Sequence, residues 1–109
     1  MESIRVASTA DVPIGKMIKV KANGRVILIT NVDGGYYALN NKCPHLGGSL
    51  ADGTLENGVV TCPRHGSQYE VKSGTAVGKA KLGPIKVMPH NAERVQVKVE
   101  GTDIFVTIP

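Results

Sequence analysis

Residues 43–45 read Cys-Pro-His, and residues 62–65 read Cys-Pro-Arg-His. Each stretch holds one thiol and one imidazole, and the two stretches contain both cysteines of the chain and two of its three histidines. A Cys-x-His paired with a Cys-x-x-His supplies the donors of a [2Fe–2S] centre in which one iron takes two thiolates and the other takes two imidazoles. Cys43, His45, Cys62 and His65 are therefore the candidate metal ligands, and the pattern predicts a chain that handles electrons.

Two other interpretations of these four residues stay open. Two Cys and two His can hold a structural zinc ion, or the cysteines can form a disulfide with the histidines incidental. Zinc sites usually place the two Cys close together and the two His close together. Here each stretch supplies one of each, which favours a cluster with two chemically distinct irons.

The flanking residues extend the pattern. Leu46-Gly47-Gly48 follows the first histidine, Gly66-Ser67-Gln68-Tyr69 follows the second, a run from Asp33 to Leu39 precedes the first stretch, and Gly83-Pro84 comes later. From about residue 4 to the C-terminus, the chain resembles the Rieske family, in particular its soluble ferredoxins. The resemblance implies one [2Fe–2S] cluster on the four ligands and a loop bearing Pro84 that covers it.

Several neighbouring residues are expected to tune the cluster. Glycines let the backbone approach sulfur without a clash from Cβ, and tight turns can direct backbone N–H groups at sulfide and thiolate. The expected tuning residues are Leu46, Gly47, Gly48, Gly66, Ser67, Tyr69 and Pro84. Neutral imidazoles withhold two negative charges that four thiolates would bring, so the reduction potential rises relative to an all-cysteine cluster.

Two features place the chain within the family. High-potential members carry an extra cysteine in each ligand loop, and here Gly48 and Arg64 occupy those positions, so that disulfide cannot form. The same members carry a Ser and a Tyr whose hydroxyls donate hydrogen bonds to sulfur, and both remain here as Ser67 and Tyr69. We expect a potential between those of ferredoxins lacking the hydroxyls and of members with the disulfide, within about −150 to +300 mV.

The rest of the chain predicts an all-β fold. Short runs of β-formers alternate with Gly, Asn, Asp and Pro, and Asn23-Gly24 predicts a tight hairpin turn between strands at 16–21 and 25–32. Further strands are expected at 3–7, 36–40, 58–61, 68–71, 85–90, 94–100 and 103–108. The expected architecture is an antiparallel β sandwich or barrel with the ligand loops at one end. The resemblance to the Rieske family implies that these two loops, about 41–52 and 62–67, form a small cluster-binding subdomain. An irregular connection, about 75–84, is expected to cover the cluster.

Length and composition limit the possibilities. A chain of 109 residues is expected to form a single domain, 1–109. The longest fully apolar run is Val26–Ile29, far short of the ~20 residues that a membrane span needs, and the N-terminus lacks a signal-peptide pattern, so a cytoplasmic protein is expected. The net charge is +4, but only four residues are aromatic, which disfavours nucleic-acid binding. Lys72, Lys79, Lys81 and Lys86 form a denser basic group, either a docking patch or simply a solvated face.

The remaining residues leave no catalytic site. After the cluster takes two histidines only His90 is left, too few for a mononuclear iron held by two histidines and a carboxylate. The resemblance therefore implies a one-electron carrier between an NAD(P)H-dependent flavoprotein reductase and a terminal oxygenase of the aromatic-ring dioxygenase type. The alternatives are a small subunit of a larger redox enzyme, such as nitrite reductase, and a zinc-binding module.

Overall fold

The computed structural model describes residues 2–42, 49–63, 66–78, 80–82, 85–87 and 91–108. Strands make up most of these residues, and the helical elements among them are two 3₁₀ turns, Thr9–Asp11 and Leu50–Asp52. The expected all-β class is confirmed. Within the described part of the chain, no helix is long and apolar enough to cross a membrane.

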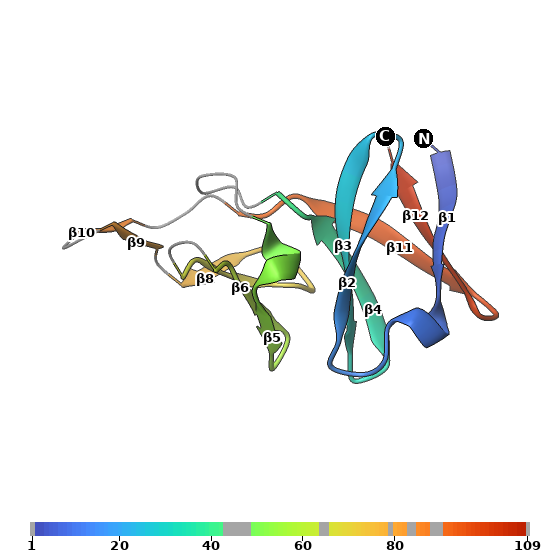
Figure 1. Ribbon diagram of the computed structural model, residues 1–109, viewed down its shortest axis with the longest axis horizontal. Coiled ribbons are helices and arrows are strands. Elements are labelled where there is room, and N and C mark those ends of the chain that lie inside the picture. Colours follow the sequence, from blue (N-terminus) through green and yellow to red (C-terminus); the bar gives the residue numbers. More distant parts are fainter. Residues whose placement is uncertain are drawn as a thin grey trace.

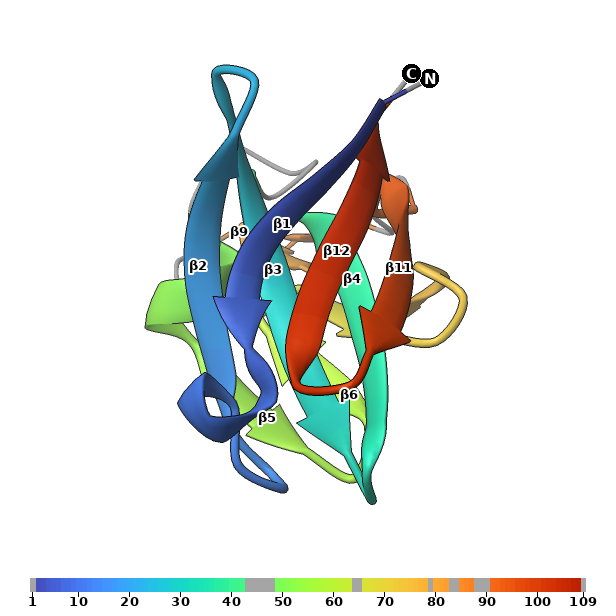
Figure 2. The same ribbon diagram turned by 90° about the vertical axis from the view of Figure 1, so that its right-hand side faces the viewer.

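A six-stranded antiparallel sheet forms the larger part of the molecule. Its strands, in spatial order, are β1 (Glu2–Ser8), β12 (Asp103–Ile108), β11 (Arg94–Glu100), β4 (Gly35–Asn40), β3 (Arg25–Val32) and β2 (Met17–Ala22). The sheet curls until β1 lies beside β2, so it is nearly closed into a barrel (Figure 2). Glu2 pairs with Ile108, which places the two ends of the described chain side by side.

The hairpin between β2 and β3 forms where the sequence predicts it. Ala22 pairs with Arg25 across a two-residue turn, and both turn residues have positive φ, 49° at Asn23 and 76° at Gly24. This is the primed turn whose twist matches that of the flanking strands, and Asn-Gly is the dipeptide that adopts it most readily. The turn therefore fixes the register of β2 on β3.

A second, four-stranded sheet packs against one side of the barrel (Figure 1). It contains β5 (Thr54–Glu56), β6 (Val59–Thr61), β7 (Gln68–Glu70) and β8 (Ala76–Gly78), and a separate pair follows, β9 (Ala80–Leu82) with β10 (Ile85–Val87). Strand β5 was not predicted, although the Asn57-Gly58 turn that joins it to β6 has positive φ at both residues, 52° and 76°, as the first hairpin does.

The expectation that residues 75–84 form an irregular connection is wrong. Residues 76–78 pair with β7, and residues 80–82 pair with β10. The physical reason is local: Ala76 lies opposite Tyr69 and is buried against the sheet, so this segment gains both backbone hydrogen bonds and apolar burial as a strand. Pro84 lies outside the described residues, so its covering role stays a prediction.

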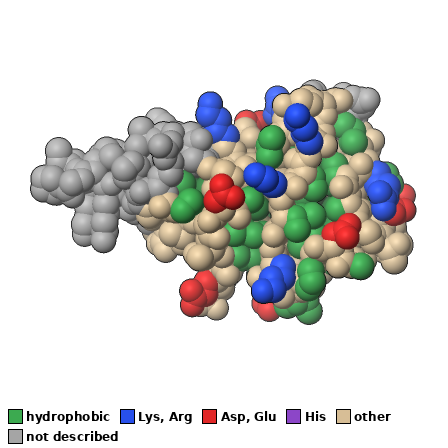
Figure 3. Space-filling model, viewed as in Figure 1, with side chains coloured by type: hydrophobic (Ala, Val, Ile, Leu, Met, Phe, Trp, Pro, Cys, Tyr) green, Lys and Arg blue, Asp and Glu red, His purple; other side chains and the backbone are tan. Residues whose placement is uncertain are grey.

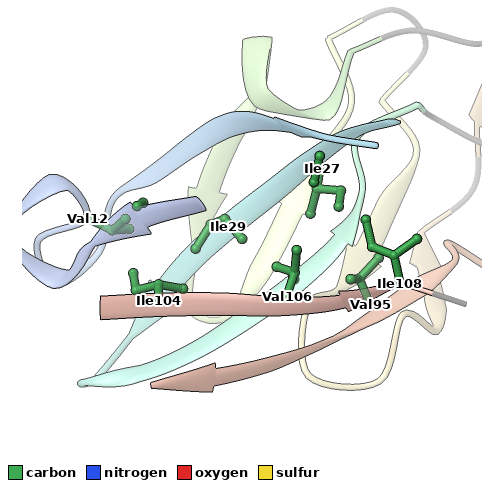
Figure 4. Close-up of a cluster of buried hydrophobic side chains, with 10 residues drawn as sticks. Val12, Ile27, Ile29, Val95, Ile104, Val106 and Ile108 are labelled. Atoms are coloured by element: carbon green, nitrogen blue, oxygen red, sulfur yellow. The ribbon is translucent and has the colours of Figure 1, made fainter. Parts of the chain in front are cut away.

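Two apolar cores meet at β3. Figure 4 shows the barrel core, to which β3 contributes Ile27 and Ile29. Leu28 points the other way and packs, with Leu39, against the small sheet. Because alternate residues of a strand face opposite sides, burial on both faces explains the apolar residues 27–29, whereas Val26 at the start of the run is exposed. This strand therefore joins the small sheet to the barrel.

Candidate metal centre

The structure describes part of the predicted site. Cys62, Gly66, Ser67 and Tyr69 are among the described residues. Cys43, His45, His65, Leu46, Gly47, Gly48 and Pro84 lie outside them, and their roles stay predictions. The geometry below therefore concerns the second ligand loop and the two ends of the first.

Cys62 follows the last residue of β6 and begins a closed turn. Its backbone N–H donates to the carbonyl oxygen of Ser67 at 2.7 Å, and the N–H of Gly66 donates back to the carbonyl oxygen of Cys62 at 3.2 Å. Gly66 has φ of 77°, a conformation that glycine adopts without the clash that a Cβ would cause. The turn thus fixes the Cys62 backbone at the end of a paired strand, with the residue only 1% exposed.

Ser67 carries the most informative polar atom of the site. The residue is 1% exposed, and its Oγ has no hydrogen-bond partner among the described residues. Buried hydroxyls are nearly always hydrogen-bonded, because an unsatisfied one costs about 1–3 kcal/mol. An acceptor beside this hydroxyl would remove the cost, and the bridging sulfide or thiolate of a cluster is such an acceptor.

Tyr69 lies two residues further, in the middle of β7. It is fully buried and is the largest of the fully buried side chains of the described chain. It belongs to the same apolar core as Cys62, together with Val60, which lies opposite it on β6. Its ring therefore stabilises the sheet that carries Cys62, whatever its hydroxyl contributes.

Asn41 fastens both ends of the first ligand loop, and sequence reasoning missed it. Its backbone N–H donates to the carbonyl oxygen of Val26 at 3.0 Å, and its carbonyl oxygen accepts from the N–H of Leu50 at 2.9 Å. Its side-chain Nδ2 donates to Ser49 Oγ at 2.8 Å, and its Oδ1 accepts from the N–H of Ala51 at 2.9 Å. The side chain is buried, and its bonds link the strand side of the loop to its exit.

Gly53 brings the exit of the first loop against the entry of the second. A Cβ added at residue 53 would overlap the carbonyl oxygen of Thr61, the residue before Cys62. The N–H of Gly53 also donates to the carbonyl oxygen of Leu50 at 3.0 Å, which closes the short 3₁₀ turn. Only glycine permits this approach, and the signal in the sequence, Asp52-Gly53, reads merely as a turn.

The donor set suits an iron–sulfur cluster. A buried thiol at a rigid turn, a buried hydroxyl lacking a described acceptor and close backbone packing between the two loops are what a sulfide-bridged cluster requires of its surroundings. The described residues therefore fit the group that the four-ligand pattern predicts.

Comparison with known proteins agrees with this chemistry. A family model described as the Rieske [2Fe-2S] domain matches residues 2–89. The 3-phenylpropionate/cinnamic acid dioxygenase ferredoxin subunit of Shigella boydii serotype 4 (strain Sb227) is 34% identical over 110 residues, covering 100% of this chain and 96% of the relative.

Solved structures share the architecture. The ferredoxin of carbazole 1,9a-dioxygenase from Nocardioides aromaticivorans IC177 superposes with a TM-score of 0.82 at 24% identity, covering 97% of both chains, which supports the fold alone. A chain in the complex of reduced oxygenase and oxidized ferredoxin in carbazole 1,9a-dioxygenase gives a TM-score of 0.80 at 25% identity, covering 95% of this chain and 91% of that one.

Proposed function

Because this chain belongs to the Rieske [2Fe–2S] family, we propose that Cys43, His45, Cys62 and His65 hold its cluster. The two thiolates would bind one iron and the two imidazoles the other. The protein is a ferredoxin of a Rieske dioxygenase system, an electron carrier rather than a catalyst. The full-length match to a dioxygenase ferredoxin subunit is the observation that carries this function.

The cluster, when bound, supplies a centre that accepts and releases one electron at a time. The protein's part is to hold it rigidly and to set its potential. Cys62 would present a thiolate from a turn fixed by its hydrogen bond with Ser67, and the Ser67 hydroxyl would donate to sulfur. Such a donor stabilises the more negative reduced state and so raises the potential.

The remaining tuning residues are part of the same proposal. Gly66 would permit the tight second turn, and the Tyr69 hydroxyl would donate to a ligand thiolate. The predicted residues outside the described part, with the same role, are Leu46, Gly47, Gly48 and Pro84. We also propose that residues 1–109 form a single domain with ligand loops at about 41–52 and 62–67.

The protein carries its electron to a terminal oxygenase. In the complex of reduced oxygenase and oxidized ferredoxin in carbazole 1,9a-dioxygenase, a ferredoxin is bound to such a component. We propose that the electron arrives from an NAD(P)H-oxidising flavoprotein reductase, since the chain has no flavin- or nicotinamide-binding fingerprint of its own. We also propose a cytoplasmic location, supported by the likeness to a dioxygenase ferredoxin subunit.

Iron and acid-labile sulfide analysis of anaerobically purified protein tests the proposal. The expected result is an equal content of iron and sulfide, a red-brown colour that bleaches on reduction, and a paramagnetic signal after dithionite treatment. Cys62→Ser and His65→Ala should each reduce cluster content sharply, whereas His90→Ala should leave it unchanged. Protein that contains zinc and no sulfide would refute the assignment.

A further inference from the structure

An open hollow lies between the β2–β3 hairpin and the residues that follow β4. Its volume is about 560 Å³, and its lining includes Lys19, Arg25, Lys42, Ser49 and Glu93. Three of these side chains carry positive charge and one carries negative charge. The hollow is therefore basic, in a protein whose net charge is +4.

The charges within the hollow do not cancel. Arg25 Nη1 lies 3.1 Å from Glu93 Oε1, so these two neutralise each other in an exposed ion pair. Lys19 and Lys42 are both exposed, and Glu93 is the only carboxylate in the described lining. Two positive charges are thus left facing outward.

Three other cations of the described chain contact partners elsewhere, whereas Lys16, Lys21 and Arg94 are exposed and lie outside the lining of the hollow. Arg5 pairs with Asp103 at 2.8 Å, and Lys98 pairs with Glu100 at 2.6 Å. Lys72 lies over the Tyr37 ring, 5.7 Å from its centroid. Of the basic group that the sequence singled out, the other three side chains lie outside the described part. Figure 3 shows several Lys and Arg side chains along the upper edge of the face in view.

The hollow borders the first ligand segment. Lys42 immediately precedes Cys43, and it forms an isolated β-bridge with Ser49, so both ends of the 43–48 segment meet at this rim. Asn41, which also lines the hollow, holds the same two ends together through its hydrogen bonds. Whatever occupies the hollow therefore lies against Lys42 and Ser49, the residues that flank the first ligand segment.

We propose that this hollow receives an acidic segment of the terminal oxygenase, with Lys19 and Lys42 contacting its carboxylates. The inference rests on the proposed function and adds the chemistry of the partner's surface. Two exposed lysines without a carboxylate partner, in a hollow bordered by the residues that flank the first ligand segment, create a local field that draws an oppositely charged surface to this part of the molecule. The contacts would orient the docked pair for electron transfer, while their exposure keeps the complex short-lived.

Small redox probes test the local field. Reduced protein is mixed in a stopped-flow instrument with hexacyanoferrate(III), which is anionic, or with tris(1,10-phenanthroline)cobalt(III), which is cationic. For the native protein, oxidation by hexacyanoferrate(III) should be fast at low salt and slow down as salt is added. Lys19→Glu and Lys42→Glu should each slow it by about fivefold or more at low salt and speed up oxidation by the cobalt complex.

Lys98→Glu is the matched control, because it makes the same charge change at a lysine that lines no part of the hollow. If Lys98→Glu alters the rates as much as Lys42→Glu, only the net charge matters and the proposal is overturned. Iron and sulfide contents are measured first on each variant. A variant that does not bind a cluster is thereby distinguished from one that binds it but attracts the anionic oxidant less.

The oxygenase itself provides the second test. Carbodiimide treatment joins lysine amines directly to carboxylates, so it is applied to a mixture of this ferredoxin and the oxygenase component that accepts its electrons. Cross-linked peptides from Lys19 or Lys42 to oxygenase Asp or Glu are expected. Cross-links confined to other lysines, such as Lys72 or Lys98, would overturn the proposal.

Discussion

The backbone N–H of Cys62 donates a 2.7 Å hydrogen bond to the carbonyl oxygen of Ser67. This bond closes the second ligand loop on itself and leaves the Ser67 side chain buried within the turn that begins at a ligand thiol. A change at Ser67 that removes only the hydroxyl would therefore act on the electronic surroundings of Cys62 while the backbone bond persists.

Ser67→Ala should lower the reduction potential. A hydrogen bond to a charged acceptor contributes about 1.5–3 kcal/mol, and for a one-electron couple this corresponds to a drop of about 65–130 mV. Protein-film voltammetry measures it. Ser73→Ala is the control, because the Ser73 hydroxyl is exposed and donates to Glu70 at 2.9 Å. Equal potentials for the native protein and Ser67→Ala would show that the hydroxyl does not contact sulfur.

Tyr69→Phe should lower the potential as well, with a modest loss of stability. The substitution keeps the ring that fills the core and deletes one buried hydroxyl, which costs about 0.5–1.5 kcal/mol in unfolding free energy. Voltammetry and urea unfolding report the two effects separately. Tyr36→Phe, which removes a hydroxyl bonded to the Thr9 carbonyl oxygen on the barrel, should leave the potential unchanged. An unaltered potential in Tyr69→Phe would count against a bond from this phenol to a ligand.

Asn41→Ala should loosen the first ligand loop. It removes two side-chain hydrogen bonds and leaves the Ala51 N–H without its acceptor, at a cost of about 2–3 kcal/mol. We expect faster loss of the cluster in mild urea, followed by absorbance, and a broadened paramagnetic spectrum in native buffer.

Asn31→Ala is the matched control for that prediction. Asn31 is also buried, and its side chain donates to the Val12 carbonyl oxygen and, at 3.4 Å, to the Tyr36 hydroxyl, and accepts from the N–H of Gly34, but it lies on the barrel. It should cost similar stability and leave the spectrum of the folded protein intact. If both variants broaden the spectrum equally, Asn41 has no special role at the loop.

Gly53→Ala should be strongly destabilising, by about 1–3 kcal/mol from overpacking, because the new methyl group meets a backbone oxygen that cannot rotate away. Since that oxygen belongs to Thr61, next to Cys62, cluster content should fall as well. Gly24→Ala is the comparison: its Cβ would meet nothing within 4 Å, so only the positive φ is penalised. The midpoint of urea unfolding and the iron content per chain check the outcome.

Most of the fold was open to prediction because its signals are local. Val95, Val97 and Val99 alternate with polar residues and mark β11, and Asn23-Gly24 marks the first hairpin. Strand β5 escaped because three residues, Thr54–Glu56, are too short to show a period. Burial of β3 on both faces depends on the small sheet lying across Leu28, a contact that no local pattern encodes.

The candidate site, like the fold, has residues that local sequence signals predict and residues that they do not. The four proposed ligands are predicted from residue type and spacing, and the family match upholds the iron–sulfur cofactor over the zinc and disulfide interpretations. Asn41 and Gly53 could not be predicted. One works through hydrogen bonds to residues eight to ten positions away, and the other through a neighbour on a different strand. Their sequence surroundings look like ordinary turns.

The pairing of Glu2 with Ile108 has a consequence for how this unit can be joined to others. The two ends of the described chain lie side by side on the barrel, and Figure 1 places them at its upper edge, away from the small sheet whose strand β6 leads into Cys62. A polypeptide fused at either end, or a host sequence into which the whole unit is inserted, would therefore attach to the barrel. The small sheet and the loop that begins at Cys62 would remain accessible to a redox partner.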